Sequence, residues 1–143
     1  MYRGKKPVYW SIPCHTALAE AEVEYADHVS QSIYFKLPVV GSPQTSLLVW
    51  TTTPWTLPAN LGVAYNSAFS YSMIRVGEEA YILSALLVDQ VVEKLGWDNY
   101  EIVRSLHAED LAGLTYQHPF CQRTGKLYPG DHFVENLKLA ISF

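Results

Sequence analysis

Hydrophobic residues gather along the chain in short runs that are separated by turn residues. β-Branched and aromatic side chains predominate in these runs, which predict strands over residues 32–40, 46–53, 62–65, 71–76 and 80–85. Residues 77–78, Gly-Glu, separate two runs closely enough for a tight hairpin, whereas residues 41–43, Gly-Ser-Pro, predict a looser connection. The pattern is therefore typical of a mainly β fold.

A helical pattern occurs once with clarity, between residues 86 and 95. Apolar side chains recur there at helical spacing, at Leu87, Val88, Val91, Val92 and Leu95. Gly96 supplies a stop, because glycine readily adopts the left-handed conformation that ends helices. A second helical turn is predicted over 107–113, where acidic residues favour its start and Gly113 its end. The predicted fold class is mainly β with some α, an antiparallel or barrel-like sheet with peripheral helices.

Composition limits the classes of function. The 143 residues are 49% hydrophobic and 17% charged, which describes one globular domain able to bury a core. A formal net charge of −4 argues against DNA as a partner, because proteins that grip a duplex need a basic surface. Two cysteines indicate a reducing compartment, and no apolar run has the length of a signal peptide or a membrane span. We expect a cytoplasmic chain with no membrane partner.

The stretch WTTTPWTLPAN at 50–60 combines hydroxyl side chains, proline and one amide without any charge. Pro54 cannot donate to a sheet, so the three threonines are predicted to end a strand at its rim. Alternation along a strand directs Thr51 and Thr53 to one face and Thr52 to the other. The proline-rich residues that follow predict an ordered loop carrying Asn60. Such a surface can bind a neutral polar group, although threonines in strands and prolines in turns also have a purely structural explanation.

WTTTPWTLPAN resembles the threonine-rich motif of the editing domain of isoleucyl-tRNA synthetases, a connective polypeptide inserted into the catalytic domain of these class I enzymes. YRGKKPVYW at 2–10 and TALAEAEVEY at 16–25 resemble the segment that leads from the catalytic domain into the insertion, and GDHFVEN at 130–136 resembles a later strand. Related valyl and leucyl domains carry arginine at the position of Thr53, so the motif favours the isoleucyl branch. The resemblance divides the chain into a connecting segment, 1–25, and an editing domain, 26–143, truncated at its C-terminal end.

The resemblance implies a barrel-like editing domain that hydrolyses valine wrongly esterified to isoleucine tRNA. In this family, as is known, one methylene group gives only about 1–3 kcal/mol of discrimination, so a second site removes the smaller product. By position, Thr52 and Asn60 are the implied catalytic residues: Thr52 contacts the substrate near the ester, and Asn60 holds the ribose or aminoacyl group. Thr51, Thr53 and Trp50 are the implied substrate-binding wall. No Ser-His-Asp or Cys-His spacing predicts a covalent nucleophile, so water is the expected attacker.

The chain departs from the family pattern after residue 136. The family continues with GTG-x-VH and HG-x-x-D, whose aspartate anchors the substrate's ammonium, whereas this chain reads NLKLAISF over 136–143. We expect weak or absent editing by the chain alone, and the alternative is a catalytically incomplete piece that only binds the aminoacyl-tRNA end. HIGH-like and KMSKS-like signatures are absent too, so ligation of isoleucine with ATP belongs to the parent enzyme, and no cofactor is expected here. The implied partners are the 3′ end of Val-tRNA(Ile) and the remainder of the synthetase.

Two further residue groups have open or weak interpretations. Cys14-His15 and His118-x-x-Cys121 contain zinc ligands, but Ser11 breaks the C-x-x-C pair that relatives carry, so we expect packed thiols and no metal. The basic residues near the amino end are either phosphate contacts or a solvated segment; they are Arg3, Lys5 and Lys6.

Overall fold

The structure is a computed structural model that describes residues 7–27, 29 and 31–130. The chain divides into two compact units, Met1–Ser30 and Gln31–Phe143, which are treated separately below. The boundary predicted after residue 25, between the connecting segment and the editing domain, stays a prediction. Arg3, Lys5 and Lys6 lie outside the described residues, as does GDHFVEN apart from Gly130.

The amino-terminal unit contains one small antiparallel ribbon. Strands β1 (Trp10–Ser11) and β2 (Thr16–Ala17) pair with Trp10 opposite Ala17, and a single 3₁₀ turn, η1 (Glu20–Glu22), follows. His15 adopts a positive φ of 53° in the turn between the two strands. Two strands of this length form no core, and the described side chains of this unit are largely exposed.

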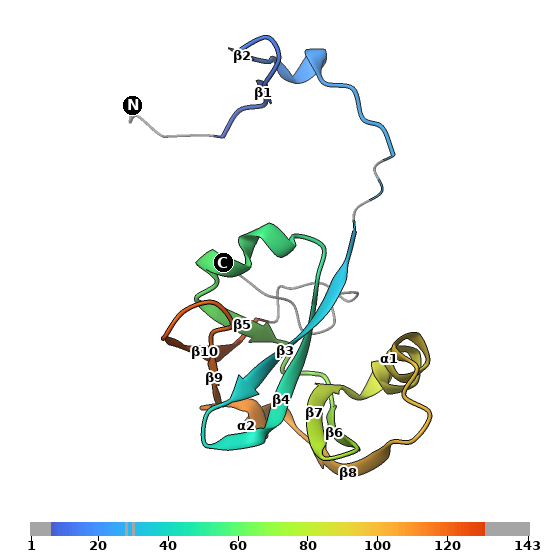
Figure 1. The fold of residues 1–143 in the computed structure, drawn as a ribbon. Helices are drawn as coiled ribbons and strands as arrows, with labels where there is room; N and C mark the ends of the chain where they lie inside the picture. Colours follow the sequence, from blue (N-terminus) through green and yellow to red (C-terminus); the bar gives the residue numbers. More distant parts are fainter. Residues whose placement is uncertain (1–6, 28, 30, 131–143) are drawn as a thin grey trace. The chain divides into compact units, whose positions relative to one another are not determined.

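The second unit is built around one eight-stranded sheet in the order β5-β10-β9-β3-β4-β7-β6-β8 (Figure 1). Most neighbours are antiparallel, but β10 pairs with β5 and β4 pairs with β7 in parallel. Among the described residues β5 and β8 do not pair with each other, so the sheet is open. Its strands are β3 (Ile33–Val39), β4 (Ser42–Thr51), β5 (Gly62–Tyr65), β6 (Tyr71–Val76), β7 (Glu79–Ser84), β8 (Glu101–Leu106), β9 (Thr115–Gln117) and β10 (Thr124–Pro129).

Two tight turns join neighbouring strands of the sheet, one between β3 and β4 and one between β6 and β7. The tight hairpin predicted at residues 77–78 joins β6 to β7, and Gly77 has φ +62°. The connection from β3 to β4 is tighter than residues 41–43 predict, because Val39 pairs with Ser42 across only Val40 and Gly41. Gly41 makes this turn possible with φ +83°, and a register shift between Pro38 and Val39 adjusts the ladder beside it.

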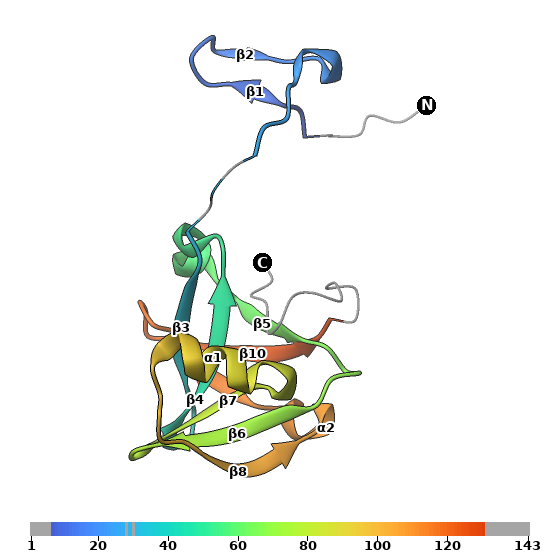
Figure 2. The same cartoon turned by 90° about the vertical axis from the view of Figure 1, so that its right-hand side faces the viewer.

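Helices cover the sheet where the apolar periodicity predicts them. The 3₁₀ turn η3 (Ala85–Leu87) leads into α1 (Val88–Leu95), which ends at Gly96 with φ +66°. Figure 2 shows α1 in front of the sheet, and its buried Val88 and Val91 pack against side chains of β4, β6 and β7. The predicted turn over 107–113 contains α2 (Ala108–Leu111), where the Asp110 carboxylate accepts a hydrogen bond from the His107 amide at 2.8 Å.

The two faces of the sheet bury separate apolar clusters. On the face away from α1 the cluster gathers side chains from every strand of the sheet, including Leu37, Leu47, Val49 and Tyr116. Leu48 and Leu83, offset by one residue from Leu47 and from Ile82, belong instead to the cluster beneath α1. Period-two alternation therefore gives β4 and β7 two buried faces. The mainly β fold class with some helix is confirmed.

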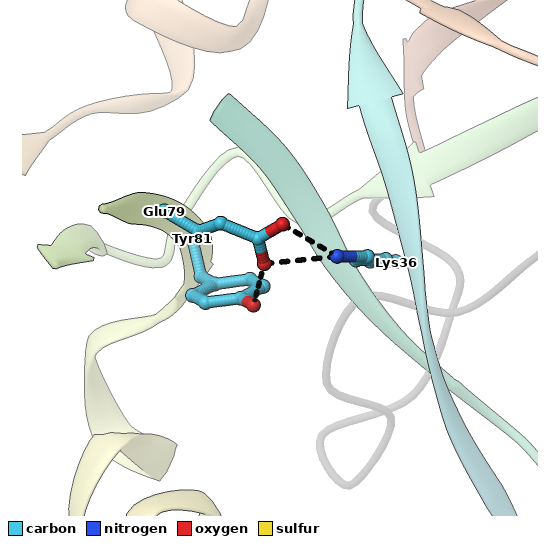
Figure 3. Close-up of polar contacts among 3 residues, drawn as sticks. All are labelled: Lys36, Glu79 and Tyr81. Atoms are coloured by element: carbon cyan, nitrogen blue, oxygen red, sulfur yellow. Dashed lines mark hydrogen bonds and ion pairs between the residues drawn. The ribbon is translucent and has the colours of Figure 1, made fainter. Parts of the chain in front are cut away.

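A polar cluster crosses the sheet on the side of α1. The Lys36 ammonium on β3 donates to both carboxylate oxygens of Glu79 on β7, at 2.7 and 2.8 Å, and the Tyr81 hydroxyl donates to one of them (Figure 3). These bonds hold the pKa of Glu79 below its usual value, with the Lys36 contact the larger cause. Burial, and then the contact with Glu79, raises the pKa of Tyr81 to about 12. The cluster thereby ties β3 to β7 across the intervening β4.

Candidate functional site

The threonine-rich stretch begins where β4 leaves the sheet. Thr51 is the last residue of the strand and is buried, and its hydroxyl oxygen accepts a hydrogen bond from the Thr53 amide at 3.0 Å. The hydroxyls of Thr51 and Thr53 lie 3.3 Å apart, brought together by the turn that begins after Thr51. Thr56 adds hydrogen bonds from its hydroxyl to the carbonyl and the hydroxyl of Thr53. Three hydroxyls of the stretch are thus engaged within the turn itself.

Thr52 differs from the other threonines of the turn. Its side chain is exposed, and its hydroxyl has no hydrogen-bond partner among the residues that the structure describes. Trp50, two positions earlier, is half-buried and lines a cavity beneath α1. The sequence-predicted wall residues are therefore divided, because Thr51 and Thr53 lie together while Trp50 lies on the α1 side of the sheet. Thr52 is the member whose polar group is available to a ligand.

The loop after Thr53 is a short 3₁₀ helix, η2 (Pro54–Ala59), which ends at Asn60. Proline at the start and at Pro58 prevents a regular α-helix, as the sequence predicts. Asn60 is 2% exposed, and both ends of its amide are used within the protein. Its Nδ2 donates to the Gly62 carbonyl at 2.8 Å, and its Oδ1 accepts from the Tyr116 hydroxyl. In this arrangement Asn60 fixes the exit of the turn, and its contact with a substrate stays a prediction.

Strands β9 and β10 and the loop between them hold η2 from outside. His118, which is 4% exposed, lies with Nε2 3.0 Å from the Leu57 carbonyl oxygen. A carbonyl only accepts, so Nε2 carries the hydrogen and Nδ1 is the accepting nitrogen. Arg123 donates from its guanidinium to the carbonyls of Pro58, at 3.2 Å, and Asn60. Carbonyls at the end of η2 and at Asn60 thus receive side-chain donors from distant residues, and the Leu57 carbonyl also accepts from the Asn60 amide at 3.0 Å.

Three of these supports come from residues that the sequence analysis assigned otherwise or did not single out. The sequence indicates His118 only as a potential zinc ligand, and it singles out neither Tyr116 nor Arg123. Cys121 Sγ lies 3.0 Å from His118 Nδ1, which also accepts from the Phe120 amide at 3.1 Å. The imidazole is thus occupied on both nitrogens as part of the loop. The available signal was the end of a short helical turn near Asn60, because the last carbonyls of a helix need donors from outside it.

The electrostatics of the turn are nearly neutral. Burial raises the pKa of Tyr116, an effect that Arg123 and Asn60 oppose, so its hydroxyl remains a donor at neutral pH. Arg123 is the cation nearest the turn by hydrogen bonding, and its Nε is buried without a partner among the described residues. The turn itself carries hydroxyls, amides and carbonyls with no carboxylate or imidazole. Its chemistry is suited to orienting a polar group and a water molecule and not to forming a covalent intermediate.

Comparison with known proteins identifies the family. A family model described as tRNA synthetases class I (I, L, M and V) matches residues 1–116. The chain belongs to this family of class I tRNA synthetases. The isoleucine–tRNA ligase of Petrotoga mobilis is 46% identical over 132 residues, which are 92% of this synthetase chain and 14% of the relative. Isoleucine–tRNA ligase 1 of Oceanobacillus iheyensis is 45% identical over 137 residues, with 92% and 15% coverage.

A solved structure, the crystal structure of GlLeuRS-CP1, shares the fold of this synthetase chain. The superposition has a TM-score of 0.64 at 15% identity and covers 78% of this chain and 52% of the other. The synthetase chain spans about one seventh of the curated relatives described above. No helix within 7–27, 29 and 31–130 is long and apolar enough to cross a membrane.

Proposed function

We propose that this synthetase chain carries the editing site that hydrolyses valine wrongly esterified to isoleucine tRNA. The observation that carries the proposal is the exposed Thr52 hydroxyl, which stands beside a network of hydroxyls already fixed by Thr51, Thr53 and Thr56. A rigid turn with one available polar group is what positioning of a neutral ester requires. The relatives that are isoleucine–tRNA ligases support isoleucine tRNA as the substrate class.

Each candidate residue has a proposed role. Thr52 donates to or accepts from the ester group of the misacylated ribose, while the Thr51 and Thr53 pair fixes the wall behind it. Trp50 is a proposed substrate-binding residue. Asn60 is proposed to act at the ribose or aminoacyl group. Water attacks the ester carbonyl, donors of the turn stabilise the developing oxyanion, and a hydroxyl of the terminal ribose assists.

The proposed partners follow from the family. They are the 3′ end of valyl-tRNA(Ile) and the remainder of the synthetase, in the cytoplasm. Ester hydrolysis needs no cofactor in this chain, and ATP is used by the catalytic part of the longer enzyme. An alternative is a chain that binds the aminoacyl-tRNA end without hydrolysing it. The turn favours this alternative in one respect, because it contains no acid or base of its own.

Deacylation of valyl-tRNA(Ile) separates these functions. The purified 143-residue chain is compared with a longer protein that continues through the family's HG-x-x-D segment, with isoleucyl-tRNA(Ile) as the control substrate. The proposal predicts that the longer protein removes valine and leaves isoleucine, and that Thr52→Ala slows the removal. A longer protein that binds valyl-tRNA(Ile) but does not deacylate it would establish the binding function instead. Equal rates for the short and long proteins would show that the continuation is not needed.

A further inference from the structure

The loop between β9 and β10 brings a thiol and an imidazole together. Sγ of Cys121 lies 3.0 Å from Nδ1 of His118. Both cysteines of the chain, Cys14 and Cys121, are free and exposed, so the packed thiols that the sequence predicts are not observed. The pair is a nucleophile beside a base, and the proposed ester hydrolysis uses neither group.

The imidazole is oriented so that it can take a proton from the thiol. Its Nε2 carries the hydrogen, because it lies 3.0 Å from the Leu57 carbonyl oxygen, which only accepts. The Phe120 amide donates to Nδ1 at 3.1 Å, in agreement with a lone pair on this nitrogen. The Cys121 thiol is therefore a second donor to Nδ1. A nucleophile, a base within hydrogen-bond reach and a third group that orients the base are the arrangement that activates side chains for attack.

The base is held in place while the thiol is accessible. His118 is 4% exposed, whereas Cys121 is exposed to reagents in solution. The His118 amide donates to the Arg123 carbonyl at 3.0 Å, and the Arg123 amide donates to the Cys121 carbonyl at 2.9 Å. The side-chain amide of Gln117 donates to both of these carbonyls, each at 3.1 Å. The loop is thus closed by its own hydrogen bonds, and the pair forms without a ligand.

Cys14 provides an internal comparison for Cys121. It is equally free and exposed, but its Sγ has no hydrogen-bond partner among the residues that the structure describes. A metal is a weaker interpretation of the Cys121 pair, because structural zinc sites use four ligands. Within the described part of the chain no group of three or more His, Cys, Asp or Glu side chains could hold a metal ion. The two thiols therefore differ in having or lacking an adjacent base.

We propose that Cys121 is a site of reversible thiolation by small disulfides such as oxidised glutathione. Nδ1 of His118 takes the thiol proton as Sγ attacks one sulfur of the disulfide. A bond forms between Sγ and that sulfur, the bond between the two sulfurs of the small disulfide breaks, and the departing thiolate takes the proton from the imidazolium. Cys121 is oxidised, and the small disulfide is reduced to one free thiol and one bound half. In the reducing compartment that the sequence predicts, the mixed disulfide forms when the pool of small disulfides rises. The inference does not depend on ester hydrolysis, because neither reacting group belongs to the threonine-rich turn.

The two thiols are compared in the whole 143-residue chain. Cys14→Ser leaves Cys121 as the single thiol, and Cys121→Ser leaves Cys14. Each variant is mixed at neutral pH with an aromatic disulfide that releases a coloured thiolate. The proposal predicts that Cys121 reacts at least about tenfold faster than Cys14 in the folded chain. The two rates should become similar in urea, where the imidazole no longer lies beside the thiol. Oxidised glutathione should add one glutathionyl group to the Cys14→Ser variant, as measured by intact mass, and dithiothreitol should remove it.

His118→Gln tests the base itself. Glutamine keeps an amide donor for the Leu57 carbonyl but presents no basic nitrogen to the thiol. In the Cys14→Ser background it should lower the rate of Cys121 to about that of Cys14, with circular dichroism as the check on folding. Gln122→Ala is the matched control, because it changes an exposed neighbour in the same loop and should keep the rate. The proposal is overturned if Cys14 reacts as fast as Cys121 in the folded chain, or if folded His118→Gln reacts as fast as its parent. It is likewise overturned if oxidised glutathione leaves Cys121 unmodified. If His118→Gln does not fold, the comparison of the two thiols with and without urea decides.

Discussion

The hydroxyl of Tyr116 donates a hydrogen bond to Oδ1 of Asn60, although the two residues are 56 positions apart in the sequence. Nδ2 of the same amide donates to the Gly62 carbonyl, so Asn60 joins the exit of the threonine-rich turn to β5 and to β9 at once. Two buried groups satisfy each other in this contact, and removal of either leaves the other without a partner.

Tyr116→Phe is expected to destabilise the fold through this contact. Loss of the hydroxyl leaves the buried Oδ1 of Asn60 without its donor, which costs about 1–3 kcal/mol of unfolding free energy. Urea unfolding measures the change. Tyr128→Phe is the matched control, because Tyr128 is 54% exposed, and it should change the unfolding free energy by less than about 0.5 kcal/mol. Equal losses in the two variants would contradict a role for the buried bond.

Thr52→Ala and Thr51→Ala should separate activity from stability. Thr52 is exposed with an available hydroxyl, so its loss should leave stability within about 0.5 kcal/mol and lower valyl-tRNA(Ile) deacylation by the longer enzyme about 5- to 150-fold. Thr51→Ala removes an acceptor of the Thr53 amide and should destabilise the turn as well. Isoleucine activation by the same enzyme is the internal control and should remain nearly constant. Unchanged deacylation in Thr52→Ala would remove Thr52 from the site.

Thr52→Trp should abolish deacylation by filling the site. Thr52 is exposed at the rim, so the fold can accommodate the larger side chain of tryptophan. The indole would fill the site, and a small aminoacyl group could then no longer enter it. Thr52→Ser serves as the control, because it keeps the hydroxyl and should retain most of the activity. Single-turnover deacylation of valyl-tRNA(Ile) measures both. A tryptophan variant as active as the serine variant would place the pocket elsewhere.

Glu79→Gln should lower thermal stability at neutral pH and have little effect in acid. The contacts with Lys36 and Tyr81 lower the pKa of Glu79, so their stabilisation is fully present above the unfolded carboxyl's pKa of about 4.3. It is lost as the pH falls through the lowered pKa of the folded state. The difference in Tm between the native chain and the variant should therefore be constant above about pH 5 and shrink below about pH 4. Glu78→Gln is the control, since the Glu78 carboxylate forms no ion pair among the described residues.

Much of the sheet follows from local sequence pattern. The five strands predicted from apolar runs all exist, and α1 ends at the glycine that the pattern predicts. The predicted strand over 46–53 is instead Ser42–Thr51, because Thr52 and Thr53 already turn toward η2. Strands β8, β9 and β10 of the sheet were not predicted. Most side chains of β8 are exposed at the edge of the sheet, and β9 has three residues, too few for a detectable alternation.

The candidate site was predictable only where it depends on local sequence pattern. Alternation along a strand is local and directs Thr51 and Thr52 to opposite faces; Thr51 is buried and Thr52 exposed, but Thr52 lies beyond the end of β4, in the turn. The supports of η2 depend on His118, which meets Leu57 across 61 positions, and on Arg123. Pairings at such distances leave no periodic signal in a single sequence. Asn60 was therefore predicted as a polar residue of the site, without any indication that Tyr116 and Gly62 already engage its amide.

The support of η2 by a later part of the chain has a consequence for synthesis on the ribosome. At about 5–20 residues per second, the 61 positions between Leu57 and His118 take about 3–12 s to be translated. During that interval the carbonyls of Leu57, Pro58 and Asn60 lack the imidazole and guanidinium donors, and only the Asn60 amide is available to the Leu57 carbonyl. A nascent chain halted before residue 118 would contain the whole threonine-rich motif and still lack the supports that give it its shape.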